Sequence, residues 1–302
     1  MSDLESLLSE EEYEYVTSKS NWWGLWLFLV NWSIVVATFV FVAVWTNPLT
    51  IVLAILLLGA RHLGFGVLVH ECGHRVLFES NGLNEFCGKW FAAPPVMSNV
   101  RAYMRGHVEH HRLAGTEEDP DLINYAKYPI PRSSLKRKIW RDITGQTGWK
   151  QMKSIGRGLR YINKLKPQMR QSLIFGVGFN LLLLTGLASI GYAWLYLLWF
   201  IAFFTANPLV SRIRQIAEHG GVPNLFDLDP RNNTRTIRAS WLERLLICPH
   251  GVNYHLEHHL SSRVPIYRLK KMHELLSANS YYKYTHFPNS YMQLIREVTV
   301  PG

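Results

Sequence analysis

Two long apolar runs open the pattern of this chain, and polar stretches follow them. The first run covers residues 25–45, and the second begins near Thr50 and reaches Val69. As a helix, each is long enough to cross the roughly 30 Å hydrocarbon core of a bilayer. Trp22 and Trp45 stand at the two ends of the first run, where interfacial indole rings are expected. The pattern predicts two membrane-spanning helices joined by a short turn.

A second pair of apolar runs lies further along, at residues 172–189 and 192–210. These runs are rich in Leu, Phe and Trp, and Asn207-Pro208 is expected to bend the last turn of the second one. The predicted fold class is therefore all-α. We expect an integral membrane protein with four transmembrane helices in two hairpins, and a helical cap built from the polar remainder.

Positive charge is concentrated between the two pairs of runs. The 302-residue chain has a formal net charge of +10, and residues 75–170 hold many of its Lys and Arg, among them Lys136-Arg137-Lys138. The turns at 46–50 and 190–193 hold none. The positive-inside rule then places the polar segment and both termini in the cytoplasm. A solvated face or contact with anionic lipid explains most of this charge, and no nucleic-acid partner is expected.

Histidines cluster just beyond the predicted spans. The pattern H-x-x-H-H occurs twice, and a separate H-x-x-x-H pair stands at the end of the second apolar run. On a helix, residues i, i+3 and i+4 share one face, so the imidazoles of each cluster converge. Imidazole suits iron, zinc and copper, and several on one face are typical of a metal site. The clusters are His70 and His74; His107, His110 and His111; and His255, His258 and His259.

These motifs resemble the three histidine boxes of the membrane fatty-acid desaturase family. The flanks agree, since Asp119-Pro120-Asp121 follows the second box and the third lies within Asn253-Tyr254-His255-Leu256-Glu257-His258-His259-Leu260. The resemblance covers about residues 25–275. It implies a membrane-bound oxidoreductase that uses dioxygen and two electrons to introduce a double bond into a fatty acyl or lipid chain.

Two other functions are compatible with parts of the pattern. A hydroxylase of an alkyl, sterol or carotenoid chain would use the same scaffold and the same boxes. A His-rich membrane metal transporter or sensor would instead place its ligands inside the spans, along a path. Here the clusters lie beyond the span ends, which favours an enzyme.

The resemblance also implies the cofactor and its ligands. The metals would be two iron ions cycling between Fe²⁺ and Fe³⁺, and His219 would be the extra ligand between the second and third boxes. Nine imidazoles are enough for two metals with four or five nitrogens each. Gln215, on the same helical face as His219, could hold a water on one iron. The predicted metal ligands, which are also the predicted catalytic residues, are His70, His74, His107, His110, His111, His219, His255, His258 and His259.

The electrons are expected to come from a separate protein. The chain contains no G-x-G-x-x-G that opens a helix after a strand and no C-x-x-C iron–sulfur spacing. A ferredoxin-, rubredoxin- or cytochrome-like donor would therefore dock on the cytoplasmic face, where the basic segment 132–170 is a suitable platform. The membrane would be a bacterial inner membrane or the endoplasmic reticulum, and the lipid or acyl-chain substrate would enter from the bilayer.

We expect a single domain over residues 1–302. Its parts are a cytoplasmic N-terminal segment (1–24), the first hairpin (25–70), a cytoplasmic segment (71–171), the second hairpin (172–210) and a cytoplasmic cap (211–302).

The sequence leaves two interpretations open for Arg61 and for the N-terminal leucines, and it assigns no metal to three further histidines. Arg61 lies within the second apolar run and is either a functional intramembrane charge or a side chain that reaches the interface. Leu4, Leu7 and Leu8 also have two interpretations. They line a helical face that packs on a membrane surface or on another part of the protein, or they belong to a frayed polar tail. His250 is expected to be structural, and His273 and His286 are expected to be surface residues.

Overall fold

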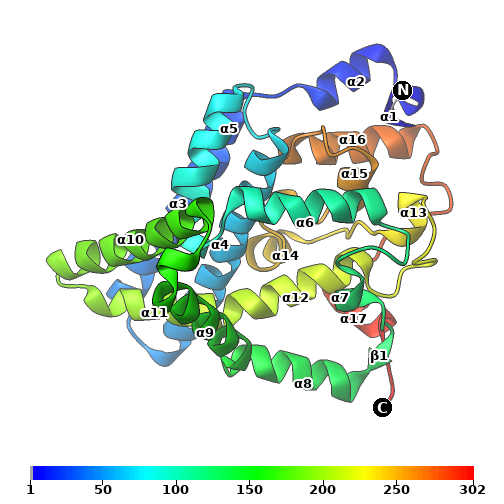
Figure 1. Cartoon of the computed structure of the whole chain (residues 1–302). Helices are drawn as coiled ribbons and strands as arrows, with labels where there is room; N and C mark the ends of the chain where they lie inside the picture. Colours follow the sequence, from blue (N-terminus) through cyan, green and yellow to red (C-terminus); the bar gives the residue numbers. More distant parts are fainter. Residues whose placement is uncertain (1–2) are drawn as a thin grey trace.

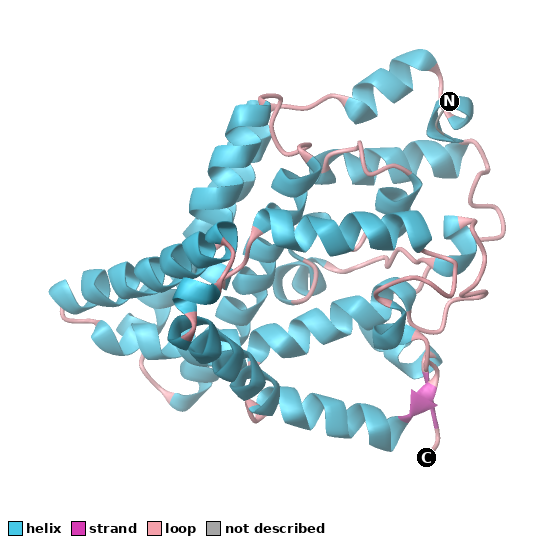
Figure 2. Cartoon of the chain, in the orientation of Figure 1, coloured by secondary structure: helices cyan, strands magenta, loops and turns pink. Residues whose placement is uncertain are grey.

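The computed structural model describes residues 3–302, and most of them are helical (Figures 1 and 2). Extended structure in this part of the chain is limited to two short parallel strands, in which Ile130 is paired with Thr299. The elements are α1 (Asp3–Leu7), α2 (Glu10–Thr17), α3 (Asn21–Val44), α4 (Pro48–His74), α5 (Asn81–Cys87), a π-helical turn (Gly88–Ala92), a 3₁₀ turn (Pro94–Val96), α6 (Val100–Leu113), α7 (Leu122–Tyr125), β1 (Ile130–Pro131), α8 (Arg132–Ile143), α9 (Gln146–Arg160), a 3₁₀ turn (Ile162–Lys164), α10 (Pro167–Ser189), α11 (Ala193–Phe204), α12 (Ala206–His219), α13 (Pro230–Asn233), α14 (Trp241–Leu246), a 3₁₀ turn (Pro249–Gly251), α15 (His255–Leu260), α16 (Ile266–Ala278), α17 (Tyr291–Glu297) and β2 (Thr299–Val300).

Four helical segments in the described chain are long and apolar enough to cross a membrane, namely α3, α4, α10 and the α11–α12 pair. Local sequence explains where two of them start. The Ser20 side chain accepts a hydrogen bond from the Trp23 N–H at the start of α3, and the Asn47 side chain caps α4, with Pro48 as its first residue. The helical fold class and the four candidate spans agree with the sequence analysis. The sidedness of the polar part stays a prediction.

The last span is longer than predicted and is interrupted. It extends to His219, and its backbone leaves helical geometry at Thr205, ahead of the expected bend at Asn207-Pro208. Pro208 has no N–H to donate to the carbonyl of Phe204, which frees that carbonyl from the helix ladder. Gly148 of α9 lies against it so closely that a Cβ on Gly148 would come within 2.2 Å of the Phe204 oxygen. A glycine is therefore required where α9 meets the break.

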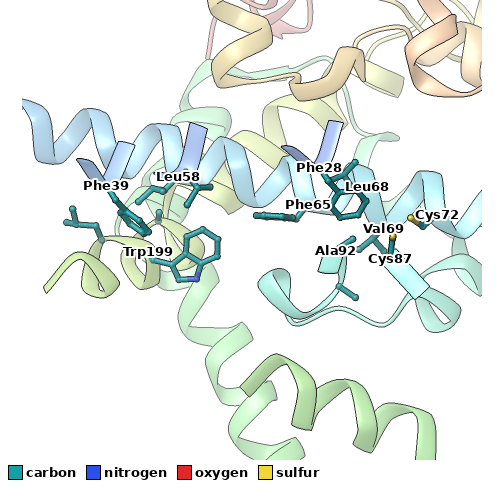
Figure 3. Close-up of a cluster of buried hydrophobic side chains, with 14 of the residues drawn as sticks. Phe28, Phe39, Leu58, Phe65, Leu68, Val69, Cys72, Cys87, Ala92 and Trp199 are labelled. Atoms are coloured by element: carbon teal, nitrogen blue, oxygen red, sulfur yellow. The ribbon is translucent and has the colours of Figure 1, made fainter. Parts of the chain in front are cut away.

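Helix α4 lies at the centre of the apolar core and carries the first histidine cluster at its end. Its residues Leu58 and Phe65 are fully buried, and Trp199 of α11 and Phe39 of α3 join them (Figure 3). The approach of α4 to α12 is close, since a Cβ on Gly59 would lie 2.4 Å from that of Ala206. Packing of α3, α11 and α12 around α4 therefore fixes the position of the last two turns of α4, which carry His70 and His74.

Arg61 is buried inside this core, so the interpretation in which it reaches the interface is wrong. The side chain is 2% exposed. Its Nη2 donates to the carbonyl of Leu245 over 2.5 Å, and its Nη1 lies 3.4 Å from Oδ1 of Asn31. His250 lies beside Asn31, and both side chains pack against Gly64. A Cβ added to Gly64 would lie 2.2 Å from the Asn31 Oδ1 and 3.2 Å from the His250 Nε2. Arg61 thus joins α4 to α3 and to the segment that leads into the third histidine cluster.

The N-terminal helices pack against another part of the protein. Leu4, Leu8 and Val16 are buried in a cluster that includes Leu269 and Met272 of α16. Of the interpretations left open, packing within the protein is therefore the one that the structure shows for residues 4–16. Figure 1 shows α1 and α2 lying beside α16.

Candidate metal centre

Helices α4, α6, α12 and α15 bring the nine predicted ligands together. The last turns of α4 and α12 supply His70, His74 and His219, and α6 and α15 supply the H-x-x-H-H triplets. The nitrogens form two groups, and within each group they all lie within 4.8 Å of one another. One group is His70, His74, His107, His111 and His258, and the other is His110, His219, His255 and His259.

The two groups lie side by side because α6 and α15 each contribute to both. The ring centroids of His111 and His259, which belong to different groups, are only 4.3 Å apart. Within the five-membered group, the Nε2 atom of His258 lies 2.9 Å from Nε2 of both His70 and His111. The arrangement is compatible with two metal ions, one beside five nitrogen donors and one beside four.

The chemistry of these nitrogens fits a bound cation. His219 donates from Nδ1 to the carbonyl of Asn233, and Nδ1 of His255 faces the carboxylate of Glu218 at 3.5 Å. The Nε2 atoms of these two rings lie 3.0 Å apart, close enough for one metal ion to bind both. The Nε2 atoms of His74 and His259 are also buried without a hydrogen-bond partner. Buried polar atoms of this kind need an explanation, and a metal supplies one.

Burial keeps these imidazoles in the form that binds metal. It lowers the pKa of His111 to about 3 and lowers the pKa of His107, His255 and His258 well below the usual range, with neighbouring imidazoles adding to the effect. Neutral rings at physiological pH offer a free lone pair. Since neutral ligands bring no negative charge, the charge of any bound ions remains on the centre.

Carboxylates orient at least two of the predicted ligands through the Nδ1 atom of the imidazole ring. His70 Nδ1 lies 2.8 Å from Oε1 of Glu71, whose other oxygen accepts the N–H of Ile266. His110 donates to Asp119, which also accepts hydrogen bonds from the Tyr125 hydroxyl and another backbone N–H. Such partners fix the ring orientation and raise the basicity of a ligand.

The four glutamates that adjoin a predicted ligand in the sequence have different surroundings. Glu71 and Glu218 face ligands, whereas Glu109 is half-exposed and pairs with Arg112. Glu257 is fully buried, but its partners are His273, Tyr282 and Thr236. The sequence analysis expected His273 to be a surface residue, and this prediction is wrong. Its Nδ1 lies 2.5 Å from Oε1 of the buried Glu257. Sequence offers no signal for a pairing that only the fold creates.

A cavity of about 350 Å³ opens onto both groups between α6 and α12. Gln215, the predicted holder of a water, lines it together with His107 from one group and His219 from the other. Arg214 also lines it, and the sequence analysis did not single out this residue. The available signal was the i, i+4 spacing of Arg214 and Glu218 directly before the predicted ligand His219.

Comparison with known proteins supports the resemblance. The model of the fatty acid desaturase family matches residues 46–290, which is most of the chain. Dihydrorhizobitoxine desaturase of Bradyrhizobium elkanii is 28% identical over 245 residues, which make up 76% of this chain and 68% of that protein. The sn-1 oleoyl-lipid 12-desaturase of Picosynechococcus sp. is 24% identical over 261 residues, or 80% of this chain and 74% of that protein.

A plant relative is similar to a comparable extent. A sphingolipid delta(4)-desaturase-like protein of Oryza sativa subsp. japonica is 23% identical over 230 residues, or 75% of this chain and 63% of that protein. All three relatives are named desaturases, so the comparisons favour neither the hydroxylase nor the transporter alternative. The chain is a desaturase-type oxidoreductase with helices that can span a membrane, and it belongs to the fatty acid desaturase family.

Proposed function

We propose that this protein holds two irons on the nine histidines and uses dioxygen and two electrons to introduce a double bond into a fatty acyl or lipid chain. The observation that carries the proposal is the pair of adjacent groups, with five and four imidazole nitrogens converging in each. Irons on such ligands can reduce dioxygen and support removal of hydrogen from an unactivated C–H bond.

The residues of this chain supply position, orientation and charge. Burial holds the ligand imidazoles neutral, and Glu71 and Asp119 fix two of the rings by accepting their Nδ1–H. Gln215, which lines the cavity at the centre, is the proposed holder of a water on one iron. The polar lining of the cavity provides donors and acceptors for a water or a substrate group beside the metals.

The same arrangement supports access from the bilayer, and the charge distribution supports the sidedness. Helices α4 and α12 are parts of candidate spans and end at the histidines, so a lipid can approach from the bilayer. The distribution of Lys and Arg supports a centre on the cytoplasmic side of a bacterial inner membrane or the endoplasmic reticulum. The relatives named for lipid substrates support a lipid or acyl chain, and the electron donor is proposed to be a separate protein.

Expression in a host, followed by mass spectrometry of its lipids, tests the reaction. The wild-type chain should produce unsaturated lipid that His258→Ala does not, and His286→Ala is the matched control because His286 is exposed and belongs to neither group. Metal analysis of the purified protein should find close to two irons per chain. Zinc in place of iron under iron-replete growth, or full activity of His258→Ala, would contradict the proposal.

A further inference from the structure

The cavity between α6 and α12 has walls that do not suit a plain hydrocarbon. Leu63 is its aliphatic side chain, and most of the others are polar. Besides ligand histidines they include Arg214, Gln215, Ser211, Tyr103 and Glu218. An acyl chain that reacts many carbons from its polar end would bring only methylene groups to the metals, and polar side chains would lose hydration around them.

Arg214 is the cationic side chain of this wall. It also lines a small second cavity with His70, His255 and His258, so it borders spaces that both metal groups line. Its Nε and Nη2 lie 2.7 and 2.8 Å from the two carboxylate oxygens of Glu218. Nη1 is left without a hydrogen bond to the described residues, on a side chain that is 25% exposed.

The chemistry of the wall selects an anionic partner. A guanidinium only donates hydrogen bonds and matches carboxylate or phosphate oxygens best. The loaded centre adds positive charge, because nine neutral imidazoles do not compensate two cations. Two carboxylates also line the cavity. Glu218 is already paired with Arg214, and Asp121 does not line the second cavity that Arg214 borders. An anionic group is therefore directed to Arg214, next to the metals.

The size of the cavity agrees with a short reach. A volume of about 350 Å³ holds roughly a dozen water-sized groups at ~30 Å³ each. A phosphate with about six carbons has about eleven non-hydrogen atoms and fills that space, and a carboxylate with the same chain fits within it. We infer that the cavity binds the anionic end of the substrate, a carboxylate or a phosphate, on Arg214, and that the double bond forms within about six carbons of it. This inference rests on the proposed desaturase function and adds its substrate class.

Binding of short probes tests the inference without turnover. Hexanoate, hexyl phosphate and hexanol would be titrated into the iron-loaded protein in lipid nanodiscs, by calorimetry and by the change in the iron spectrum. One of the two anions should bind at least tenfold more tightly than hexanol, and which one does so identifies the anion. Equal binding of hexanol, or no binding of either anion, would overturn the inference.

The variants separate charge from structure. Arg214→Met with Glu218→Gln removes the guanidinium without leaving a buried carboxylate unpaired, and it keeps an oxygen at position 218, opposite Nδ1 of His255. This double variant should keep its iron and lose the preference for the anion at least tenfold, and Arg214→Lys should restore part of it. Loss of iron in the double variant and in Arg214→Lys would show that Arg214 and Glu218 only support His255, and it would overturn the inference. Unchanged anion preference in an iron-loaded double variant would likewise overturn the inference.

Product analysis separates the two proposals. Mapping of the new double bond in lipids from the expression host should place it within about six carbons of the carboxylate or phosphate. A double bond in the middle of the chain would overturn the inference and leave the desaturase function intact. Absence of any new double bond together with anion-selective probe binding would count against the reaction and support the site.

Discussion

His110 and Asp119 form a hydrogen bond of 2.9 Å from Nδ1 to Oδ1, and both side chains are buried. The pair joins a ligand on α6 to the loop that follows it. Asp119 has two further donors, the Tyr125 hydroxyl and the N–H of Asp121. A carboxylate held in this way keeps the His110 ring fixed, with its Nε2 aimed at the four-membered histidine group.

Replacing Asp119 should weaken metal binding in that group. Asp119→Ala removes the acceptor behind His110, and loss of such a partner typically lowers metal affinity about 10–100-fold. We expect iron content near one per chain after dialysis against a mild chelator, when the wild type keeps two. Elemental analysis and Mössbauer spectroscopy provide the measurement.

Glu109→Gln is the matched control for this experiment. Glu109 also adjoins His110 in the sequence, but it is half-exposed and pairs with Arg112. Its replacement should leave iron content unchanged. Equal loss of iron in both variants would mean that the Asp119 contact does not orient the ligand.

Arg61→Met should destabilise the protein although it makes the core more apolar. The substitution leaves the Leu245 carbonyl and the Asn31 side chain without their donor, and each buried unsatisfied group costs ~1–3 kcal/mol. A lower midpoint of thermal unfolding in detergent is expected, with earlier loss of iron, because the Leu245 segment leads into the third histidine cluster. Arg263→Met, at an exposed position, should show neither effect. Unchanged thermal stability of Arg61→Met would mean that Arg61 does not hold these segments together.

The nine histidines that the fold brings together and the four candidate spans could be predicted from the sequence for clear reasons. Apolar runs of about 20 residues and H-x-x-H-H repeats are local patterns. They indicate which residues share one helix or one helical face without knowledge of the tertiary contacts. Arg61 and His273 were harder, because their partners lie 184 and 16 residues away. The break at Thr205 lies against Gly148 of another helix, a contact that the local sequence does not indicate. Contacts made only in the folded chain decide such details.

The cytoplasmic placement of the centre can be tested with engineered cysteines. Arg160→Cys and Pro48→Cys create thiols at two exposed positions, and the three native cysteines are buried, so background labelling should be low. The Lys and Arg asymmetry predicts that position 160 is labelled from the cytoplasm and that position 48 is labelled only from the opposite side. The reverse pattern would discard the proposed topology and the donor surface with it.

Turnover should require an external electron donor. The purified protein with NADH or NADPH alone should give no product, and a ferredoxin with its reductase should restore activity. Sustained turnover from the nicotinamide alone would refute the need for a donor. Measured rates should also fall as salt increases, because docking between opposite charges is screened over about 10 Å at 0.1 M salt.

The basic surface of α8 should be where that donor docks. Lys136 and Arg137 are exposed there, while Lys138 stacks on the Tyr128 ring at 5.0 Å and is best left in place. Lys136→Glu with Arg137→Glu should slow donor-dependent turnover roughly tenfold at low salt, since charge complementarity acts mainly on the association rate. Iron content should stay unchanged, because α8 contributes no histidine to either group.

Lys270→Glu with Lys271→Glu is the matched control for the α8 variant. It makes the same charge change on exposed positions of α16 and should have a much smaller effect on donor-dependent turnover. Equal slowing by both pairs would assign the salt dependence to net charge, and the docking surface would then lie elsewhere.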